Sequence, residues 1–173
     1  MNLSEKTRKI RAVILDVDGV LTDGRIGYFG ASEELKFFHV KDGHALKLLR
    51  RAGFRVGILS GRSSEANRRR AEELGMDFLY QGEKDKNAAF TRILAEQDLE
   101  PSECLYVGDD VVDIPVMRRA GIGVAVADAV PEVISAADWR TAAAGGQGAV
   151  YETAVWLLKE TAKWDQVMAR YLR

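Results

Sequence analysis

Short apolar runs alternate with longer amphipathic segments along most of the chain. Each run has the length of one strand and is bounded by polar residues or glycine, as is typical of strands buried on both faces. The runs predict strands at residues 12–15, 56–59, 78–80, 105–107 and 123–126. The segments between them have a helical period and predict helices at residues 43–51, 63–74, 87–97 and 111–119;.

Two segments interrupt this alternation. From Arg25 to Val40, two aromatic-rich stretches flank Gly30-Ala31-Ser32, which predicts a β-hairpin projecting beside the first strand;. Residues 142–148 are small and Gly-rich, and a helical pattern follows over residues 150–173. Because strand–helix alternation favours parallel sheets, we expect an α/β fold, a Rossmann-like parallel sheet with helices on both faces. We expect one domain over residues 1–173, with the hairpin at about 25–40 and a C-terminal helix and tail at about 148–173.

The composition of the chain limits the kinds of partner that we expect. The chain has 173 residues, with 25 Lys plus Arg against 26 Asp plus Glu, and this balance argues against a nucleic-acid partner;. No apolar run is long enough to cross a bilayer, and the polar start does not resemble a signal peptide;. These features predict a cytoplasmic protein without a membrane partner.

The first candidate for chemistry is an acidic segment directly after the first predicted strand. Asp16 and Asp18 are two positions apart, so both carboxylates can face one crevice as the chain turns. Like charges this close are costly without a cation or protons, which indicates a metal. The alternative is an acidic turn that caps a helix.

A second acidic cluster, Asp109, Asp110 and Asp113, follows the predicted strand at 105–107. Parallel sheets bind ligands at the carboxyl ends of their strands, so the two clusters are expected at one edge. Carboxylate oxygens are the ligands that Mg²⁺ prefers. Helix capping by one aspartate would explain only part of this cluster.

Two weaker signals point to a phosphate. Ser60-Gly61-Arg62 stands between a strand and a helix, where a hydroxyl and backbone N–H groups can hold phosphate oxygens;. Ser60 is also simply a good helix cap. Lys86 opens another helix and could meet a phosphoryl oxygen, although a lone lysine is usually solvated;.

The order of these motifs, Asp-x-Asp-Gly-x-Leu-Thr, Ser, Lys and Gly-Asp-Asp-x-x-Asp, resembles the haloacid dehalogenase-like superfamily over residues 13–126. Asp18 matches the second aspartate that the phosphatases of that group have and the dehalogenases lack. The resemblance implies a phosphatase in which Asp16 is the nucleophile and Asp18 the general acid and base. Ser60 and Lys86 would bind the phosphoryl oxygens.

The resemblance also implies a cofactor, Mg²⁺, held by Asp16, the backbone carbonyl of Asp18 and Asp109. Asp110 and Asp113 would be further metal ligands or supporting groups, one of which orients Lys86 or a metal-bound water. The segments before and after Ser60 are only long enough for the predicted elements. No cap domain fits there, so the site would be open or covered by another subunit.

A capless chain with this hairpin and a Gly-rich tail resembles the 3-deoxy-D-manno-octulosonate 8-phosphate phosphatases nearly end to end. That resemblance implies a role in lipopolysaccharide synthesis and a homotetramer, in which hairpins form a central barrel and a neighbour's tail helps to close each site. Four hairpin rings would otherwise form an exposed apolar patch: Tyr28, Phe29, Phe37 and Phe38;. The alternative is that these rings pack on their own domain.

Several residues bear on which substrate the phosphatase would bind. The Arg62 guanidinium could pair with the carboxylate of a phosphorylated sugar acid. Gln147 and Tyr151, however, stand where the family's tail carries arginines. One alternative is a nonulosonate 9-phosphate phosphatase, although such relatives replace the Arg62 equivalent with an acid. Another is a non-catalytic module that only assembles or regulates, against which the complete set of motifs argues.

Overall fold

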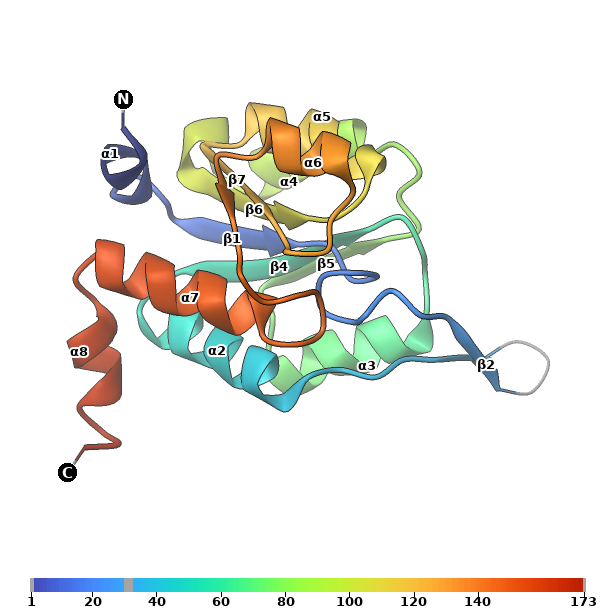
Figure 1. The fold of residues 1–173 in the computed structure, drawn as a ribbon, viewed down its shortest axis with the longest axis horizontal. Helices are drawn as coiled ribbons and strands as arrows, with labels where there is room; N and C mark the ends of the chain where they lie inside the picture. Colours follow the sequence, from blue (N-terminus) through green and yellow to red (C-terminus); the bar gives the residue numbers. More distant parts are fainter. Residues whose placement is uncertain (1, 30–32, 173) are drawn as a thin grey trace.

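A six-stranded parallel sheet forms the centre of the molecule in the computed structural model, which describes residues 2–29 and 33–172 (Figure 1). The strand order is β5-β4-β1-β6-β7-β8, so the first strand of the chain lies near the middle. The strands are β1 (Ala12–Leu15), β4 (Arg55–Ser60), β5 (Phe78–Gln81), β6 (Cys104–Gly108), β7 (Ile122–Ala125) and β8 (Trp139–Arg140). All four residues of β1 are buried, which explains why this strand is a continuous apolar run;.

Helices cover both faces of the sheet (Figure 1). One face carries α2 (Val40–Arg51), α3 (Glu65–Leu74) and α7 (Ala149–Glu160). The other carries α4 (Lys86–Gln97), α5 (Ile114–Arg119) and α6 (Pro131–Ala136). Shorter elements are α1 (Leu3–Thr7), α8 (Trp164–Met168) and the 3₁₀ turns Pro101–Glu103 and Val111–Asp113. This arrangement confirms the α/β fold class, and none of these helices is both long and apolar enough to span a membrane within the described residues.

The predicted strands and helices are confirmed to within a few residues at each end, but four short elements were not predicted. These are α1, α6, β8 and the 3₁₀ turn Pro101–Glu103, which are two to six residues long and too short to show a period;. The helical pattern expected over residues 150–173 is divided between two helices, because α7 ends at Glu160 and α8 starts at Trp164. Ala162 breaks the helix with a left-handed φ of 56°. Lys163 then donates to the Ala52 carbonyl at 2.8 Å and ties this turn to the end of α2.

The hairpin projects from the body of the molecule as β2 (Gly27–Phe29) paired with β3 (Glu33–Leu35) (Figure 1). The expected turn at Gly30-Ala31-Ser32 lies outside the described residues. Three of the four rings are exposed as expected, with Tyr28 75%, Phe29 69% and Phe37 73% accessible. The expectation is wrong for Phe38, which packs on its own domain beneath the Arg70 guanidinium, 5.3 Å from its ring centroid;.

Candidate active site

Two strand ends bring the acidic clusters together. Strands β1 and β6 are direct neighbours, and the Asp16 N–H donates to the Val107 carbonyl at 3.1 Å. Beyond them lies a crevice of about 280 Å³. It is lined by Asp16, Asp18, Gly24, Ser60, Gly61, Arg62, Lys86, Asp109, Asp110 and Val112. All the residues expected to carry out catalysis or to bind the metal or the phosphate therefore border one hollow, apart from Asp113, which is buried and does not line it.

Asp16 is the most enclosed acid on the crevice wall, with 6% of its surface exposed. The Lys86 ammonium lies 2.9 Å from Asp16 Oδ2. Burial raises the pKa of Asp16 to about 7, although attraction to Lys86 opposes this rise;. In the metal-free protein, Lys86 alone therefore does not offset the cost of burying the ionised Asp16 carboxylate.

Asp109 faces Asp16 from the end of β6 and depends on Gly19. Gly19 has a φ of +92°, and a Cβ there would lie 2.0 Å from Asp109 Oδ2. Only glycine combines this backbone conformation with the close approach. Burial raises the pKa of Asp109 to about 8, and repulsion from Asp16 and Asp113 adds to the rise.

Asp113 is fully buried, and both of its oxygens are engaged. Oδ1 accepts from Lys86 Nζ and from the Tyr106 hydroxyl, each at 2.7 Å. Oδ2 accepts from the backbone N–H groups of Asp109 at 3.0 Å and Asp110 at 3.2 Å. Asp113 thus fixes the direction of Lys86 and the turn that carries Asp109. Asp110 instead caps that turn, accepting from the Val111 N–H at 2.7 Å.

Lys86 has 2% of its side chain exposed and bridges Asp16 and Asp113. Desolvation lowers its pKa, but attraction to the two carboxylates outweighs burial and raises the pKa above its ordinary value. Lys86 is therefore a permanent cation in the floor of the crevice. Tyr106, which the sequence did not indicate as a site residue, completes this network from a position within β6.

The carboxylates of Asp16, Asp109 and Asp113, here called the acidic wall, fit a divalent cation. One oxygen each of Asp16, Asp109 and Asp113 lies within 4.8 Å of the others. Asp109 Oδ1 is buried and has no hydrogen-bond partner among the described residues. Unpartnered carboxylate oxygens beside carboxyls of raised pKa are what a hard cation would satisfy. The Asp18 side chain is not in this oxygen cluster, so its expected contribution through the backbone carbonyl stays a prediction.

The phosphate-binding candidates close the other side of the crevice. Ser60 is 1% exposed, and its Oγ accepts from the Arg62 N–H at 3.3 Å. The Arg62 guanidinium is paired with Glu34 of β3 at 2.5 Å. It is therefore held by the hairpin and not free for a substrate carboxylate in this structure.

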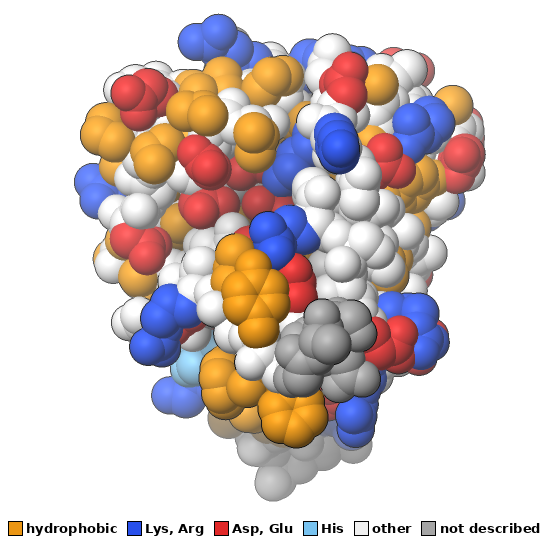
Figure 2. All heavy atoms as spheres, turned by 90° about the vertical axis from the view of Figure 1, so that its right-hand side faces the viewer, with side chains coloured by type: hydrophobic (Ala, Val, Ile, Leu, Met, Phe, Trp, Pro, Cys, Tyr) orange, Lys and Arg blue, Asp and Glu red, His pale blue; other side chains and the backbone are white. Residues whose placement is uncertain are grey.

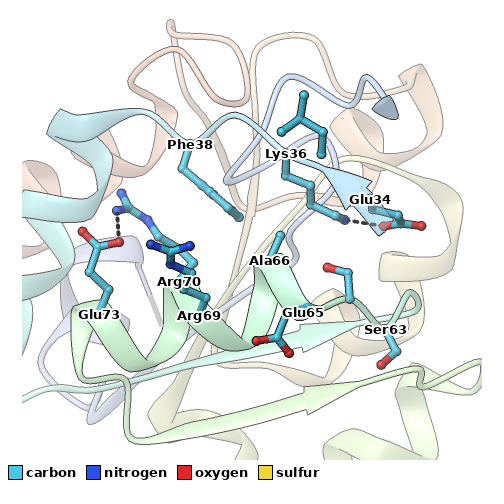
Figure 3. A pocket seen from close by; sticks show the side chains of 11 residues that line it. Glu34, Lys36, Phe38, Ser63, Glu65, Ala66, Arg69, Arg70 and Glu73 are labelled. Atoms are coloured by element: carbon cyan, nitrogen blue, oxygen red, sulfur yellow. Dashed lines mark hydrogen bonds and ion pairs between the residues drawn. The ribbon is translucent and has the colours of Figure 1, made fainter. Parts of the chain in front are cut away.

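Lys36, just after β3, was missed by the sequence analysis. Its side chain is 2% exposed, and its ammonium lies 2.5 Å from Asp18 Oδ1 and 3.4 Å from Glu34 Oε2. Figure 3 shows Lys36 and Glu34 side by side at one end of a hollow of about 610 Å³ between the hairpin and α3. The one signal in the sequence was the alternation of acid and base in Glu34-Leu35-Lys36.

The Gly-rich segment was expected in the tail, but its contact with the loop after Asp18 was not foreseen. The Gly146 N–H donates to the Val20 carbonyl at 2.9 Å. A Cβ on Gly145 would lie 1.7 Å from the Gly19 carbonyl oxygen. The tail thus packs directly on the loop that follows Asp18. Gln147 and Tyr151 face elsewhere, into a separate hollow of about 760 Å³ beside Trp156.

Comparison with known proteins agrees with this geometry. The haloacid dehalogenase-like hydrolase model matches residues 27–121, which is more than half of the chain. The chain is 44% identical to the 3-deoxy-D-manno-octulosonate 8-phosphate phosphatase of Escherichia coli strain K12, covering 93% of this chain and 86% of that protein.

Solved structures give the same result. The phosphatase of that name from Moraxella catarrhalis, in complex with magnesium, phosphate and KDO, has a TM-score of 0.94 at 36% identity, covering 97% of each chain. A probable phosphatase from Pseudomonas syringae has a TM-score of 0.95 at 38% identity, covering 99% of this chain and 97% of that one. The chain therefore belongs to the haloacid dehalogenase-like hydrolase family and, within it, is similar over nearly its whole length to the 3-deoxy-D-manno-octulosonate 8-phosphate phosphatases.

Proposed function

We propose that this protein is a magnesium-dependent phosphatase that hydrolyses 3-deoxy-D-manno-octulosonate 8-phosphate through an aspartyl phosphate at Asp16. The strongest support is the crevice itself, where Asp16 and Asp18 share a wall with the cation Lys86. Relatives at 44% identity bear the name of this activity, which supports the choice of substrate.

In the first step, an oxygen of Asp16 attacks phosphorus in line, and the bond between phosphorus and the sugar oxygen breaks. Asp18 gives its proton to the departing sugar oxygen, so an alcohol leaves. In the second step, water attacks the phosphorus of the aspartyl phosphate while Asp18 takes a proton from that water. The Asp16 carboxylate and inorganic phosphate are then released.

Ser60 and Lys86 act on the phosphoryl group during both steps. Lys86 is a cation at 2.9 Å from the nucleophile, so its charge also favours the phosphoryl oxygens that arrive there;. Asp113 keeps Lys86 in this position through the 2.7 Å contact and needs no movement during the reaction. The Ser60 hydroxyl offers a donor from the end of β4.

Asp16, Asp109 and the Asp18 backbone carbonyl would hold Mg²⁺. The bound ion would neutralise charge on the transferring phosphoryl group. The raised pKa values of Asp16, about 7, and Asp109, about 8, describe the metal-free protein, in which the carboxyls bind protons instead.

The sugar acid would lie over the crevice near Arg62. There the substrate carboxylate would replace Glu34 as the partner of the Arg62 guanidinium;. Gln147 and Tyr151 line a hollow that does not include the catalytic carboxylates of their own chain. Any action of theirs on a substrate would be at a neighbouring subunit's site, and their departure from the family's arginines is the main argument against the octulosonate as substrate, while the chemistry is unaffected.

The hairpin favours a homotetramer in which a neighbour completes the site. Tyr28, Phe29 and Phe37 are each about 70% exposed on one projection, and Figure 2 shows apolar side chains gathered around it. Exposed rings that gather on one projection differ from apolar residues scattered singly over a surface, and they are typical of an interface. A cytoplasmic location and a role in lipopolysaccharide synthesis complete the proposal.

The test is phosphate release with Mg²⁺ from the octulosonate 8-phosphate, a nonulosonate 9-phosphate and several hexose phosphates. We expect a preference for the octulosonate that is abolished by chelation and reduced at least about 10⁴-fold in Asp16→Asn, with Asp165→Asn on the exposed face of α8 as matched control. Preference for another ester would keep the mechanism and change the substrate. A folded, metal-loaded protein that hydrolyses none of them would favour the non-catalytic module.

A further inference from the structure

Lys36 has a buried ammonium beside the crevice, in contact with Asp18, that the reaction described above does not use. We propose that Lys36 is a positioning residue for proton transfer, which holds one carboxylate oxygen of Asp18 so that the other faces the leaving group. This inference rests on the proposed function, because it assigns Lys36 a role only if Asp18 exchanges protons with the ester.

The environment of Lys36 shows that its buried charge is held by specific partners. Its side chain is only 2% exposed, and lysine is almost never buried to this extent unless it is paired;. The pairing is with Asp18 Oδ1 at 2.5 Å and Glu34 Oε2 at 3.4 Å. An exposed lysine on a hairpin would keep its hydration, so burial here must be compensated by these two contacts.

The contact divides the two oxygens of Asp18 between two tasks. Oδ1 is engaged by Lys36, whereas Oδ2 is buried and has no hydrogen-bond partner among the described residues. Asp18 lines the crevice together with Asp16. In the first step the proton leaves Oδ2 for the sugar oxygen, and in the second step the same oxygen takes a proton from water. Fixing Oδ1 restricts rotation of the carboxyl and keeps Oδ2 at the reacting atoms.

Lys36 is itself held from the far side. Glu34, which has 15% of its side chain exposed, contacts both Lys36 and the Arg62 guanidinium. Burial raises the pKa of Glu34, but the contacts with Arg62 and Lys36 outweigh burial and lower it, so Glu34 stays ionised. The chain of charges runs from the loop after β1, through the hairpin, to the loop after β4. Before substrate binds, it therefore fixes Lys36 relative to both walls of the crevice, and the contact between Glu34 Oε2 and Lys36 does not depend on Arg62.

The test compares two esters through kcat/KM, which reports only the steps up to departure of the leaving group. The octulosonate ester needs a proton on its leaving oxygen, whereas p-nitrophenyl phosphate does not, since nitrophenolate is stable as an anion. We expect Lys36→Met to lower kcat/KM for the octulosonate about 10- to 100-fold and for the nitrophenyl ester less than about threefold. Lys36→Arg, which keeps the charge, should restore part of the loss.

A double-mutant cycle separates positioning from a merely structural role. If Lys36 acts through Asp18, Lys36→Met should cause no further loss in an Asp18→Asn background. Lys163→Met is the matched control, because the Lys163 ammonium is also held by a specific acceptor, the Ala52 carbonyl at the end of α2, but lies away from the crevice. It should leave both rates unchanged.

Equal losses on the two esters, or a full further loss in the Asp18→Asn background, would overturn the inference while the proposed function stands. If Lys36→Met fails to fold, Lys36→Gln, which also removes the charge, gives the same comparison, and a ratio of the two rates equal to that of the wild type would overturn the inference. Inactivity of the wild type on both esters would instead overturn the proposed function, and the inference with it.

Discussion

The sheet edge and the hairpin each supply a buried lysine to the same crevice, but on different supports. Lys86 begins a helix packed on the sheet, and Asp113, which contacts it, accepts three further hydrogen bonds from Tyr106, Asp109 and Asp110. Lys36 follows a three-residue strand whose neighbouring rings are exposed. The difference teaches that Asp16 and Lys86 are supported by the buried core, whereas the cation beside Asp18 stands on a short hairpin whose aromatic rings are exposed.

Of the two lysines, Lys86 should have the larger effect when it is removed. Lys86→Met leaves Asp16 and the buried Asp113 without their cation, and we expect a loss in kcat of about 10³-fold. We also expect the metal-free free energy of unfolding to fall by about 3–5 kcal/mol, as for other broken buried pairs. Denaturant unfolding and phosphatase assays measure both, with Lys159→Met on α7 as control. A stability loss no larger than that of Lys36→Met would contradict the contrast between the two supports.

The acidic wall should make the metal-free protein less stable as pH rises. The pKa values of Asp16 and Asp109 are raised from 3.8 to about 7 and about 8, so between these limits the folded state holds more protons than the unfolded chain. Stability from these groups is then complete below about pH 4 and is lost as pH rises through 7 to 8. Mg²⁺ should stabilise the protein more at pH 8 than at pH 6, because protons no longer compete.

Thermal unfolding in chelator and in Mg²⁺, between pH 5 and 8.5, measures this prediction. The added stability from Mg²⁺ should disappear in Asp109→Asn. A metal-free Tm that stays constant or rises across this range would show that the carboxyls are not protonated in the folded state.

The hairpin rings should affect assembly far more than the fold. Phe29 and Phe37 are 69% and 73% exposed, so replacing both by serine should change the free energy of unfolding of one subunit by less than about 1 kcal/mol;. Light scattering should nevertheless show a smaller assembly. Leu172→Ser, which alters a residue that is 79% exposed outside the hairpin, is the control and should leave the mass unchanged. An unchanged mass in the double variant would argue against the hairpin interface.

The strands and the crevice could be predicted because their signals are local. Apolar runs fix the strands, and a parallel sheet brings the residues after β1 and β6 to one edge whatever the details. Asp16 and Asp109 therefore meet as expected at one crevice. The paired state of Arg62 could not be foreseen, because its partner lies 28 residues away on the hairpin.

The remaining features depend on tertiary packing. Glu34 and Lys36 look like ordinary surface charges in sequence, and only the path of the hairpin buries them against Asp18. The break between α7 and α8 also has no strong local signal, since Ala162 is a good helix former forced into a left-handed turn;. Burial decides these positions, and burial is not visible in a residue's own neighbours along the chain.

The packing of the Gly-rich tail on the loop after Asp18 has a consequence for biosynthesis. The Gly146 N–H donates to the Val20 carbonyl, so two segments that are far apart in the sequence together complete this loop. Domains generally fold as units. The loop after Asp18 would therefore reach its final structure only once residue 146 has been synthesised, although the residues of the loop itself appear much earlier.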